Sequence, residues 1–240
     1  MTFILVHGSF SNSFSWTPLA RELTLRGHRA LAVDHVVEVV RRVAEHGPVV
    51  LVGHSRGGLT LTGVGNRVPD LVDRLVYISA WCCVDLTVGD YMQEPEYETS
   101  AVASGVLVGA PTKLGALRTN WRTADPALLA ELKNAMFAEG TDHEFRAFLN
   151  TLEPDESIDA GTERADAATW GRIPRTYVRL TADRALPLAL QDRFIAEADA
   201  LTPDNPTDVR SIDSSHLRFH LHAGDLVDVI DGLAIISAAR

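Results

Sequence analysis

The sequence predicts an α/β protein built on a mostly parallel, twisted sheet flanked by helices. Over the first eighty residues, short apolar runs of strand length alternate with helical patterns, and the same alternation returns near residue 176. The connections between these elements are short, which implies right-handed crossovers. From about residue 82 to residue 170 the alternation stops. We therefore expect a single domain spanning residues 1–240, with a helical cap inserted at about 82–170.

The first part of the chain supplies most of the expected sheet. The run at residues 49–52 has four apolar residues, three of them β-branched, as is typical of a buried parallel strand. One helical pattern closes at Gly27, a common C-terminal stop. Strands are expected at residues 3–6, 29–33, 49–55 and 75–79, and helices at 16–25, 36–44 and 59–66.

Two helices are expected within the insertion. Asp125 and a following proline begin one at residues 126–137, and a capping box of Thr141 and Glu144 begins the other at 142–149. The acidic stretches at 93–98 and 153–156 are expected to be loops. After the insertion, strands are expected at 176–180 and 208–212, and helices at 186–198 and 225–238.

Composition and charge narrow the functional classes. The chain has 240 residues, of which 46% are hydrophobic, enough to bury a full core. Its formal net charge of −10 argues against nucleic acid or an anionic membrane as a partner, because both attract basic surfaces. A small, neutral or apolar substrate fits this charge better. Oligomeric state is left open, with a homodimer as one alternative.

The termini and cysteines favour a cytoplasmic protein. The opening segment lacks the basic region of a signal peptide, and no apolar run reaches membrane-spanning length. The two cysteines, Cys82 and Cys83, are adjacent and form a poor framework for a structural disulfide. We interpret them as buried thiols, with a vicinal redox pair as the alternative.

The residues Gly53-His54-Ser55-Arg56-Gly57 form a G-x-S-x-G pattern between an expected strand and an expected helix. In this context the pattern predicts a nucleophile elbow, a tight turn that exposes the serine hydroxyl at the end of the sheet. Side chains at 53 or 57 would collide across the turn, and glycine tolerates unusual backbone angles. The alternative is a glycine-rich turn with an incidental serine. The flanking strand and helix favour Ser55 as a nucleophile.

A serine hydroxyl needs a histidine base and a carboxylate that orients it, expected on this fold in the order serine, acid, histidine. Asp183 follows the strand expected to end at residue 180, and His216 follows the strand expected to end at 212. Asp183 has a second interpretation, as an aspartate that caps the helix beginning near Leu186. The rivals are His220 and His222 for the base, and Asp208 and Asp213 for the acid.

Acyl transfer also needs two donors for the developing oxyanion. The backbone N–H of Arg56, directly after the nucleophile, is one candidate. The backbone N–H of Ser9, in the loop after the first strand, is the other. We interpret His7 as bracing that loop and His54 as a structural or pocket-wall residue.

The segments FILVHGSFSNSFSW, VVLVGHSRGG, RLTADRALP and DSSH resemble the α/β-hydrolase superfamily, in particular the small branch of plant methylesterases, hydroxynitrile lyases and their bacterial relatives. The resemblance covers nearly the whole chain. It implies an α/β-hydrolase fold and an esterase that needs no cofactor or metal. It also places Ser55, Asp183 and His216 at the triad positions and Ser9 and Arg56 at the oxyanion positions.

Two departures from that branch stand out. Leu217 follows the predicted base, where the hydroxynitrile lyases carry lysine, which argues against cyanohydrin cleavage. Only Asp34-His35 stands where relatives have a longer loop, so either the loop is deleted or a stretch between these residues is missing.

The sequence therefore predicts a serine esterase that cleaves a carboxylic ester or lactone of a small, largely apolar substrate through an acyl-enzyme. Two alternatives remain: a cofactor-free lyase, cyclase or carbon–carbon cleaving enzyme on the same scaffold, and a non-catalytic ligand receptor.

Overall fold

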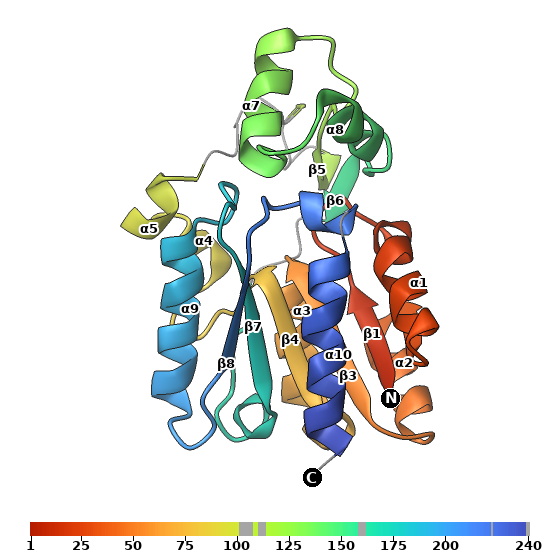
Figure 1. Ribbon diagram of the computed structural model, residues 1–240. Helices are drawn as coiled ribbons and strands as arrows, with labels where there is room; N and C mark the ends of the chain where they lie inside the picture. Colours follow the sequence, from red (N-terminus) through yellow and green to blue (C-terminus); the bar gives the residue numbers. More distant parts are fainter. Residues whose placement is uncertain (101–107, 110–113, 158–161, 222, 239–240) are drawn as a thin grey trace.

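A parallel sheet forms the centre of the computed structural model, which describes residues 1–100, 108–109, 114–157, 162–221 and 223–238 (Figure 1). Within these ranges the main sheet has six strands in the order β2-β1-β3-β4-β7-β8, and every neighbouring pair is parallel. The strands are β1 (Thr2–Val6), β2 (Arg29–Ala32), β3 (Val49–Ser55), β4 (Arg74–Ala80), β7 (Arg175–Leu180) and β8 (Asp208–Ile212). The predicted mostly parallel sheet is thus confirmed.

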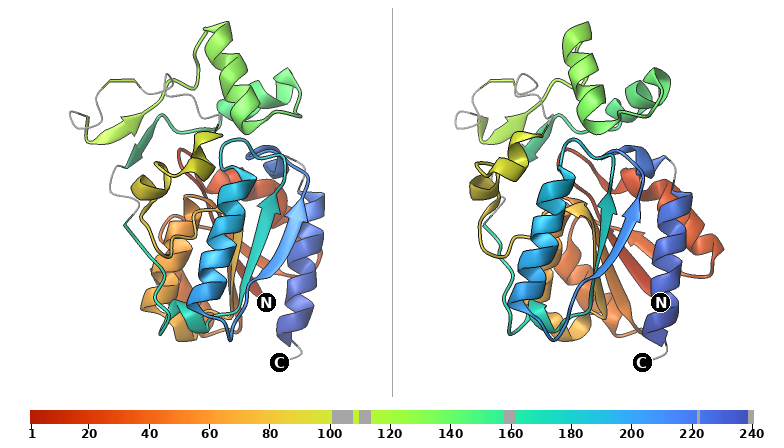
Figure 2. Two further views of the ribbon diagram at one scale, coloured as in Figure 1. Left: turned by 90° about the vertical axis from the view of Figure 1, so that its left-hand side faces the viewer. Right: turned by 60° about the vertical axis from the view of Figure 1, so that its left-hand side comes forward.

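Helices cover both faces of this sheet because successive strand side chains point to opposite sides. Phe3 and Leu5 of β1 pack with helices α1 and α10, whereas Ile4 and Val6 pack with α2, α3 and α9. Figure 2 shows the strands between these two helical layers. The helices are α1 (Thr17–Leu25), α2 (Val36–Ala44), α3 (Gly57–Arg67), α9 (Leu188–Leu201) and α10 (Gly224–Ala238). Shorter helical turns are η1 (Ser13–Trp16), η2 (Pro69–Leu71), η4 (Trp170–Arg172) and η5 (Arg218–His220).

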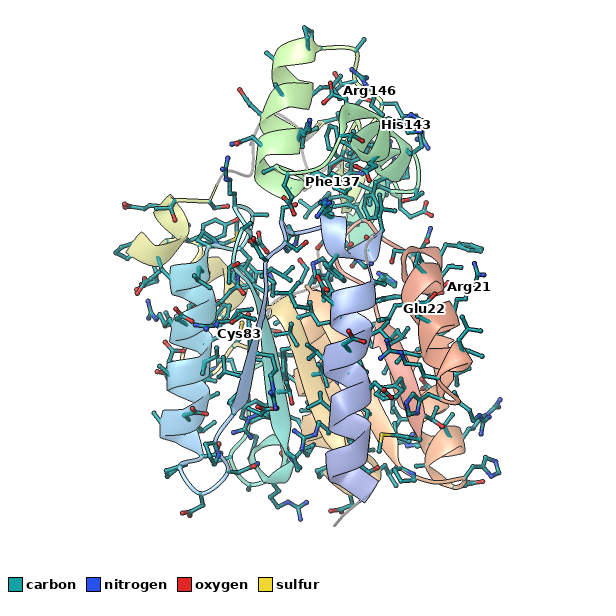
Figure 3. The ribbon with its side chains drawn as sticks, viewed as in Figure 1. Arg21, Glu22, Cys83, Phe137, His143 and Arg146 are labelled. Atoms are coloured by element: carbon teal, nitrogen blue, oxygen red, sulfur yellow. The ribbon has the colours of Figure 1, made fainter. Side chains whose placement is uncertain are left out.

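A separate group of elements stands above the carboxyl ends of the strands (Figure 1). It contains β5 (Ala116–Arg118), α7 (Pro126–Met136), α8 (Asp142–Leu149) and β6 (Asp155–Ser157), which we call the cap. Strands β5 and β6 pair antiparallel. In Figure 3, Phe137 lies at the end of α7 nearest the sheet, whereas His143 and Arg146 lie on α8 away from it. Phe137 belongs to a small apolar core that also includes Leu217 from the body.

The helix-start predictions within the cap are confirmed. The Asp125 side chain accepts the backbone N–H groups of Ala127 and Leu128, and Thr141 and Glu144 form a reciprocal capping box. The two expected loops were wrong. The stretch at 93–98 contains the single helical turn α5 (Pro95–Glu98), after α4 (Val88–Tyr91), and 153–156 runs into β6. Strand β6 forms by pairing with β5, and the acidic sequence of β6 alone does not reveal this partner.

None of the helices in the described ranges has both the length and the apolar character needed to cross a bilayer.

The close approach of α3 to the strand ends requires glycine at its start. A Cβ atom on Gly57 would lie 2.6 Å from the carbonyl oxygen of Val6 and 2.8 Å from that of His7. A Cβ atom on Gly58 would lie 2.3 Å from the carbonyl oxygen of Trp81. These contacts are shorter than van der Waals distances, so the loops after β1 and β4 could not remain where they are beside a larger residue.

We expect Gly57→Ala to lower the free energy of unfolding by about 1–3 kcal/mol, because the added methyl group meets rigid backbone. Gly232→Ala is the matched control, since this glycine lies within α10 and a Cβ atom there would have no described neighbour within 4 Å. That variant should be stabilised by about 0.5–1 kcal/mol. Urea unfolding followed by tryptophan fluorescence measures both. Equal effects of the two substitutions would contradict this packing account.

Candidate active site

Ser55 lies at the end of β3 in a strained backbone conformation. Its φ angle is +53°, a left-handed value that costs a non-glycine residue about 1–3 kcal/mol and needs support from its surroundings. The support is steric: a Cβ on Gly53 would lie 2.7 Å from Leu61, and one on Gly8 would lie 2.8 Å from the Cβ of Ser55. The unusual backbone angle thus falls on Ser55 and not, as expected, on the glycines beside it, which provide space.

His216 lies in the loop after β8 and faces Ser55. Its Nε2 lies 3.0 Å from the Ser55 hydroxyl oxygen, and its Nδ1 lies 2.6 Å from Oδ2 of Asp183. With the hydrogen on Nδ1, the histidine donates to Asp183 and accepts from Ser55. Residues that are 161 and 33 positions apart therefore form one continuous hydrogen-bonded chain.

The carboxylate of Asp183 is completely shielded from solvent, with 0% side-chain exposure. A buried charge needs hydrogen bonds in place of water, and this carboxylate has them on both oxygens. Oδ1 accepts the backbone N–H groups of Ala185 and Leu186 at 2.8 and 2.9 Å. Oδ2 accepts His216 and the hydroxyl of Ser79, each at 2.6 Å. Oδ1 thus caps the turn before α9, as one interpretation of Asp183 expected, and Oδ2 binds His216. The role of Asp183 as the acid that orients a catalytic base stays a prediction.

Ser79 was not found from the sequence. The register between β3 and β4 shifts at this point, since His54 pairs with Ile78 and Ser55 with Ala80. Ser79 is the extra residue of this bulge, and its φ angle is +35°. Bulges redirect side chains next to functional sites. Here the bulge turns the Ser79 hydroxyl toward Asp183, and no local sequence signal marks it.

The rival residues that the structure describes do not join this chain. Asp208 contacts Thr176 and Arg210, and Asp213 contacts Thr181 near the surface. His222 lies outside the described residues. His35, His46 and His143 are exposed, whereas His28 is half-buried and bonds to Asp231 at 2.8 Å.

Two buried histidines pack behind His216. The ring centroid of His54 lies 4.4 Å from that of His216 and 5.2 Å from that of His220. His220 also packs against Trp16 and stacks on Phe148 of the cap. Burial, and then the proximity of His216, lowers the pKa of His54 well below its usual value and the pKa of His220 to about 3. Both rings are therefore neutral supports for His216, which agrees with the structural role expected for His54.

The loop after β1 lies directly against the nucleophile. Ser11 N–H donates to the carbonyl of Gly8 at 3.3 Å, closing a turn whose middle residues are Ser9 and Phe10. His7 braces this loop, since its Nδ1 lies 2.9 Å from the Gly8 carbonyl and its Nε2 lies 3.1 Å from Asp34. Arg56 occupies the N-cap position of α3. The oxyanion role predicted for the N–H groups of Ser9 and Arg56 stays a prediction.

The cap also contacts the loop that carries His216. The backbone N–H of Ser215 donates to Glu139 at 2.6 Å, and that of Leu217 donates to the carbonyl of Met136 at 2.9 Å. Both residues that flank His216 are thus held by the end of α7 and the turn after it. The sequence did not indicate a role for Glu139, because the contact joins segments 76 positions apart.

Among the described residues, no group of three or more His, Cys, Asp or Glu side chains is arranged to hold a metal ion. Cys82 and Cys83 are buried free thiols, as expected. Burial raises the pKa of the Cys82 thiol to about 12 and that of Cys83 also upward, so neither forms a reactive thiolate readily.

Comparison with known proteins agrees with this architecture. The model of the alpha/beta hydrolase family matches residues 3–229. The chain belongs to this family. Methylesterase 10 of Arabidopsis thaliana is 33% identical over 101 residues, which cover 33% of this chain and only 37% of the relative. The pyrethroid hydrolase of Sphingobium wenxiniae is 22% identical over 251 residues, covering 96% of this chain and 86% of the relative.

A solved structure of a pyrethroid hydrolase from Sphingobium faniae has the same fold. It superposes with a TM-score of 0.76 at 20% identity and covers 100% of this chain and 99% of its own. The family and the fold predicted for this alpha/beta hydrolase chain are therefore confirmed.

The buried neutral state of His220 predicts a pH-dependent stability. Its pKa is about 3 in the folded alpha/beta hydrolase and about 6.5 in the unfolded chain, so as the pH falls from about 6.5 toward 3 the unfolded state takes up this proton and the folded state does not. Stability is lost as the pH falls. Between pH 7 and pH 5, His220→Phe should lose about 2 kcal/mol less unfolding free energy than the natural chain. Urea unfolding at each pH measures this, with exposed His143→Gln as the control. An unchanged pH dependence in His220→Phe would contradict the assignment.

Proposed function

We propose that this protein is a serine esterase that cleaves a carboxylic ester or lactone of a small, largely apolar substrate. The observation that carries the proposal is the hydrogen-bonded chain from Ser55 through His216 to Asp183, with distances of 3.0 and 2.6 Å. A neutral imidazole at this distance can accept the serine proton as the hydroxyl attacks. A buried, ionised carboxylate on the other nitrogen stabilises the imidazolium that results.

In the first half of the proposed reaction, Nε2 of His216 takes the proton of Ser55 while the serine oxygen bonds to the carbonyl carbon. The carbonyl electron pair moves onto oxygen, and the backbone N–H groups of Arg56 and Ser9 donate to this oxyanion. The positive end of α3, which begins beside Ser55, favours the same negative charge. When the carbonyl re-forms, the bond to the alkoxy group breaks and His216 gives its proton to the departing alcohol.

In the second half, water attacks the acyl-enzyme. His216 takes a proton from the water, the oxyanion forms again between the same donors, and the serine oxygen leaves with the proton from His216. Asp183 stays ionised throughout. All proton transfers use groups of the chain, so this route requires no cofactor.

Three observations support the substrate class. Relatives of this chain include proteins named as a methylesterase, a carbendazim hydrolyzing esterase and a pyrethroid hydrolase. The net charge of −10 favours neutral over anionic substrates. The apolar rings of Phe10 and Trp121, which meet edge to face at 5.2 Å, lie on the loop after β1 and in the cap region that adjoins it.

We expect Ser55→Ala to reduce hydrolysis of p-nitrophenyl butyrate by about 10⁴-fold or more, because the substitution removes the hydroxyl that forms the acyl-enzyme. A fluorophosphonate probe should label the natural chain at Ser55 and leave the variant unlabelled. Circular dichroism and the melting temperature provide the control for folding. Turnover that persists in Ser55→Ala would exclude this residue as the nucleophile. Absence of probe labelling, combined with binding of an unaltered ester, would favour a receptor.

Asp183→Asn tests the orienting role of the carboxylate. The amide keeps the shape of the side chain but presents a donor or a weaker acceptor to His216, which disfavours the tautomer that can accept from Ser55. We expect kcat for the same ester to fall by about 10³–10⁴-fold, as in other Ser-His-Asp enzymes. The rival Asp213→Asn, at the surface, serves as the matched control and should retain activity. A larger loss in the Asp213 variant would reassign the acid.

A further inference from the structure

The carboxylate of Glu156 connects the cap to both segments that carry the proposed oxyanion donors. Its Oε2 accepts the backbone N–H of Phe10 at 2.7 Å, and its Oε1 pairs with the guanidinium group of Arg56. The Glu156 side chain is 12% exposed and that of Arg56 is 29% exposed. Such charge-assisted contacts are stronger when shielded from water than on an open surface. Glu156 therefore restrains two loops that are far apart in the sequence.

Phe10 directly follows Ser9 and has a backbone conformation that its surroundings must hold. Its φ angle is +55°, which is rare for a bulky residue. Both backbone polar groups of Phe10 bind this part of the cap: the N–H donates to Glu156 in β6, and the carbonyl accepts the N–H of Glu153, just before β6, at 2.7 Å. The Phe10 N–H shares a peptide plane with the Ser9 carbonyl. Fixing that plane limits the directions in which Ser9 can present its own N–H.

Arg56 supplies the other proposed donor, and its side chain is held by the same carboxylate. Its backbone N–H lies between the nucleophile and Gly57, where the close contact with β1 already leaves little freedom. Glu156 pairs with Arg56 and also accepts the Phe10 N–H, so this one residue connects Arg56 to Phe10. A displacement of β6 would therefore change the relative placement of both donors.

We propose that Glu156 is a positioning residue that holds the oxyanion donors of Ser9 and Arg56 in register with Ser55. This inference rests on the proposed esterase function. Oxyanion donors act on charge that exists only in the transition state, so a misplaced donor lowers kcat and leaves KM almost unchanged. Both acylation and deacylation pass through an oxyanion. The loss therefore appears whichever step limits turnover.

The test compares two substitutions at neighbouring positions of β6. Glu156→Ala should lower kcat for p-nitrophenyl butyrate by about tenfold or more, a fraction of the loss caused by deleting a donor, while KM changes less than about twofold. Asp155→Ala is the matched control: it removes the same charge one residue away, but Asp155 pairs with Arg118 at the exposed surface. Its kcat and KM should stay within about twofold of the natural values.

The melting temperature shows whether Glu156→Ala folds. If it does not, a second variant provides the test. Glu156→Gln retains an acceptor for Phe10 but loses the ion pair with Arg56, so its kcat should lie between those of the alanine variant and the natural chain. The inference is overturned if the Glu156 variants that fold keep the natural kcat, if their loss is entirely in KM, or if Asp155→Ala loses as much. Failure of the proposed function is distinguishable, because then the natural chain itself neither hydrolyses the ester nor reacts with the fluorophosphonate at Ser55.

Discussion

The buried carboxylate of Asp183 is the interaction on which the rest of the site depends. It accepts hydrogen bonds from a strand bulge at Ser79, from the turn that leads into α9, and from His216. These partners come from three separate parts of the chain. A buried charge needs hydrogen-bond partners in place of water. The conformation of the loops at the carboxyl ends of the strands and the orientation of His216 are therefore determined together. The neutral rings of His54 and His220 then fill the space behind His216 without competing for its proton.

A second constraint is the lack of space around Ser55. The glycines at 8, 53, 57 and 58 let the loops after β1 and β4 and the start of α3 approach the end of β3 closely enough that a methyl group at any of these positions would clash. The strain in this region is carried by non-glycine residues, with positive φ angles at Phe10, Ser55 and Ser79. These three residues belong to the loop after β1, the end of β3 and the end of β4, respectively. Strain concentrated where chemistry is proposed is maintained by the surrounding packing and not by local preference.

The sequence predicted the features that depend on local pattern. Helices α2 and α8 begin and end where periodicity and capping residues indicated, and the chain order of Ser55, Asp183 and His216 matched the sites where the strands end. Contacts between distant segments could not be predicted in this way. The Ser79 bulge depends on the register of β4 against β3, and the stretch containing Glu153 and Glu156 is an acidic run whose role arises only once it lies beside Phe10. The strained angle at Ser55 was assigned to the wrong residues because a sequence shows the glycines and not the torsion.

The apolar core shared by α7, α8 and Leu217 has a consequence for how such proteins diversify. Because the backbone flanking His216 hydrogen-bonds to Met136 and Glu139, the region above the sheet is not an independent module. A chimera that grafts this region from a relative would also have to import compatible residues at positions 10, 56 and 217, whose side chains contact it. Substitutions on either side of this boundary should therefore be epistatic, and new specificities in this lineage would arise more readily by paired changes than by wholesale exchange.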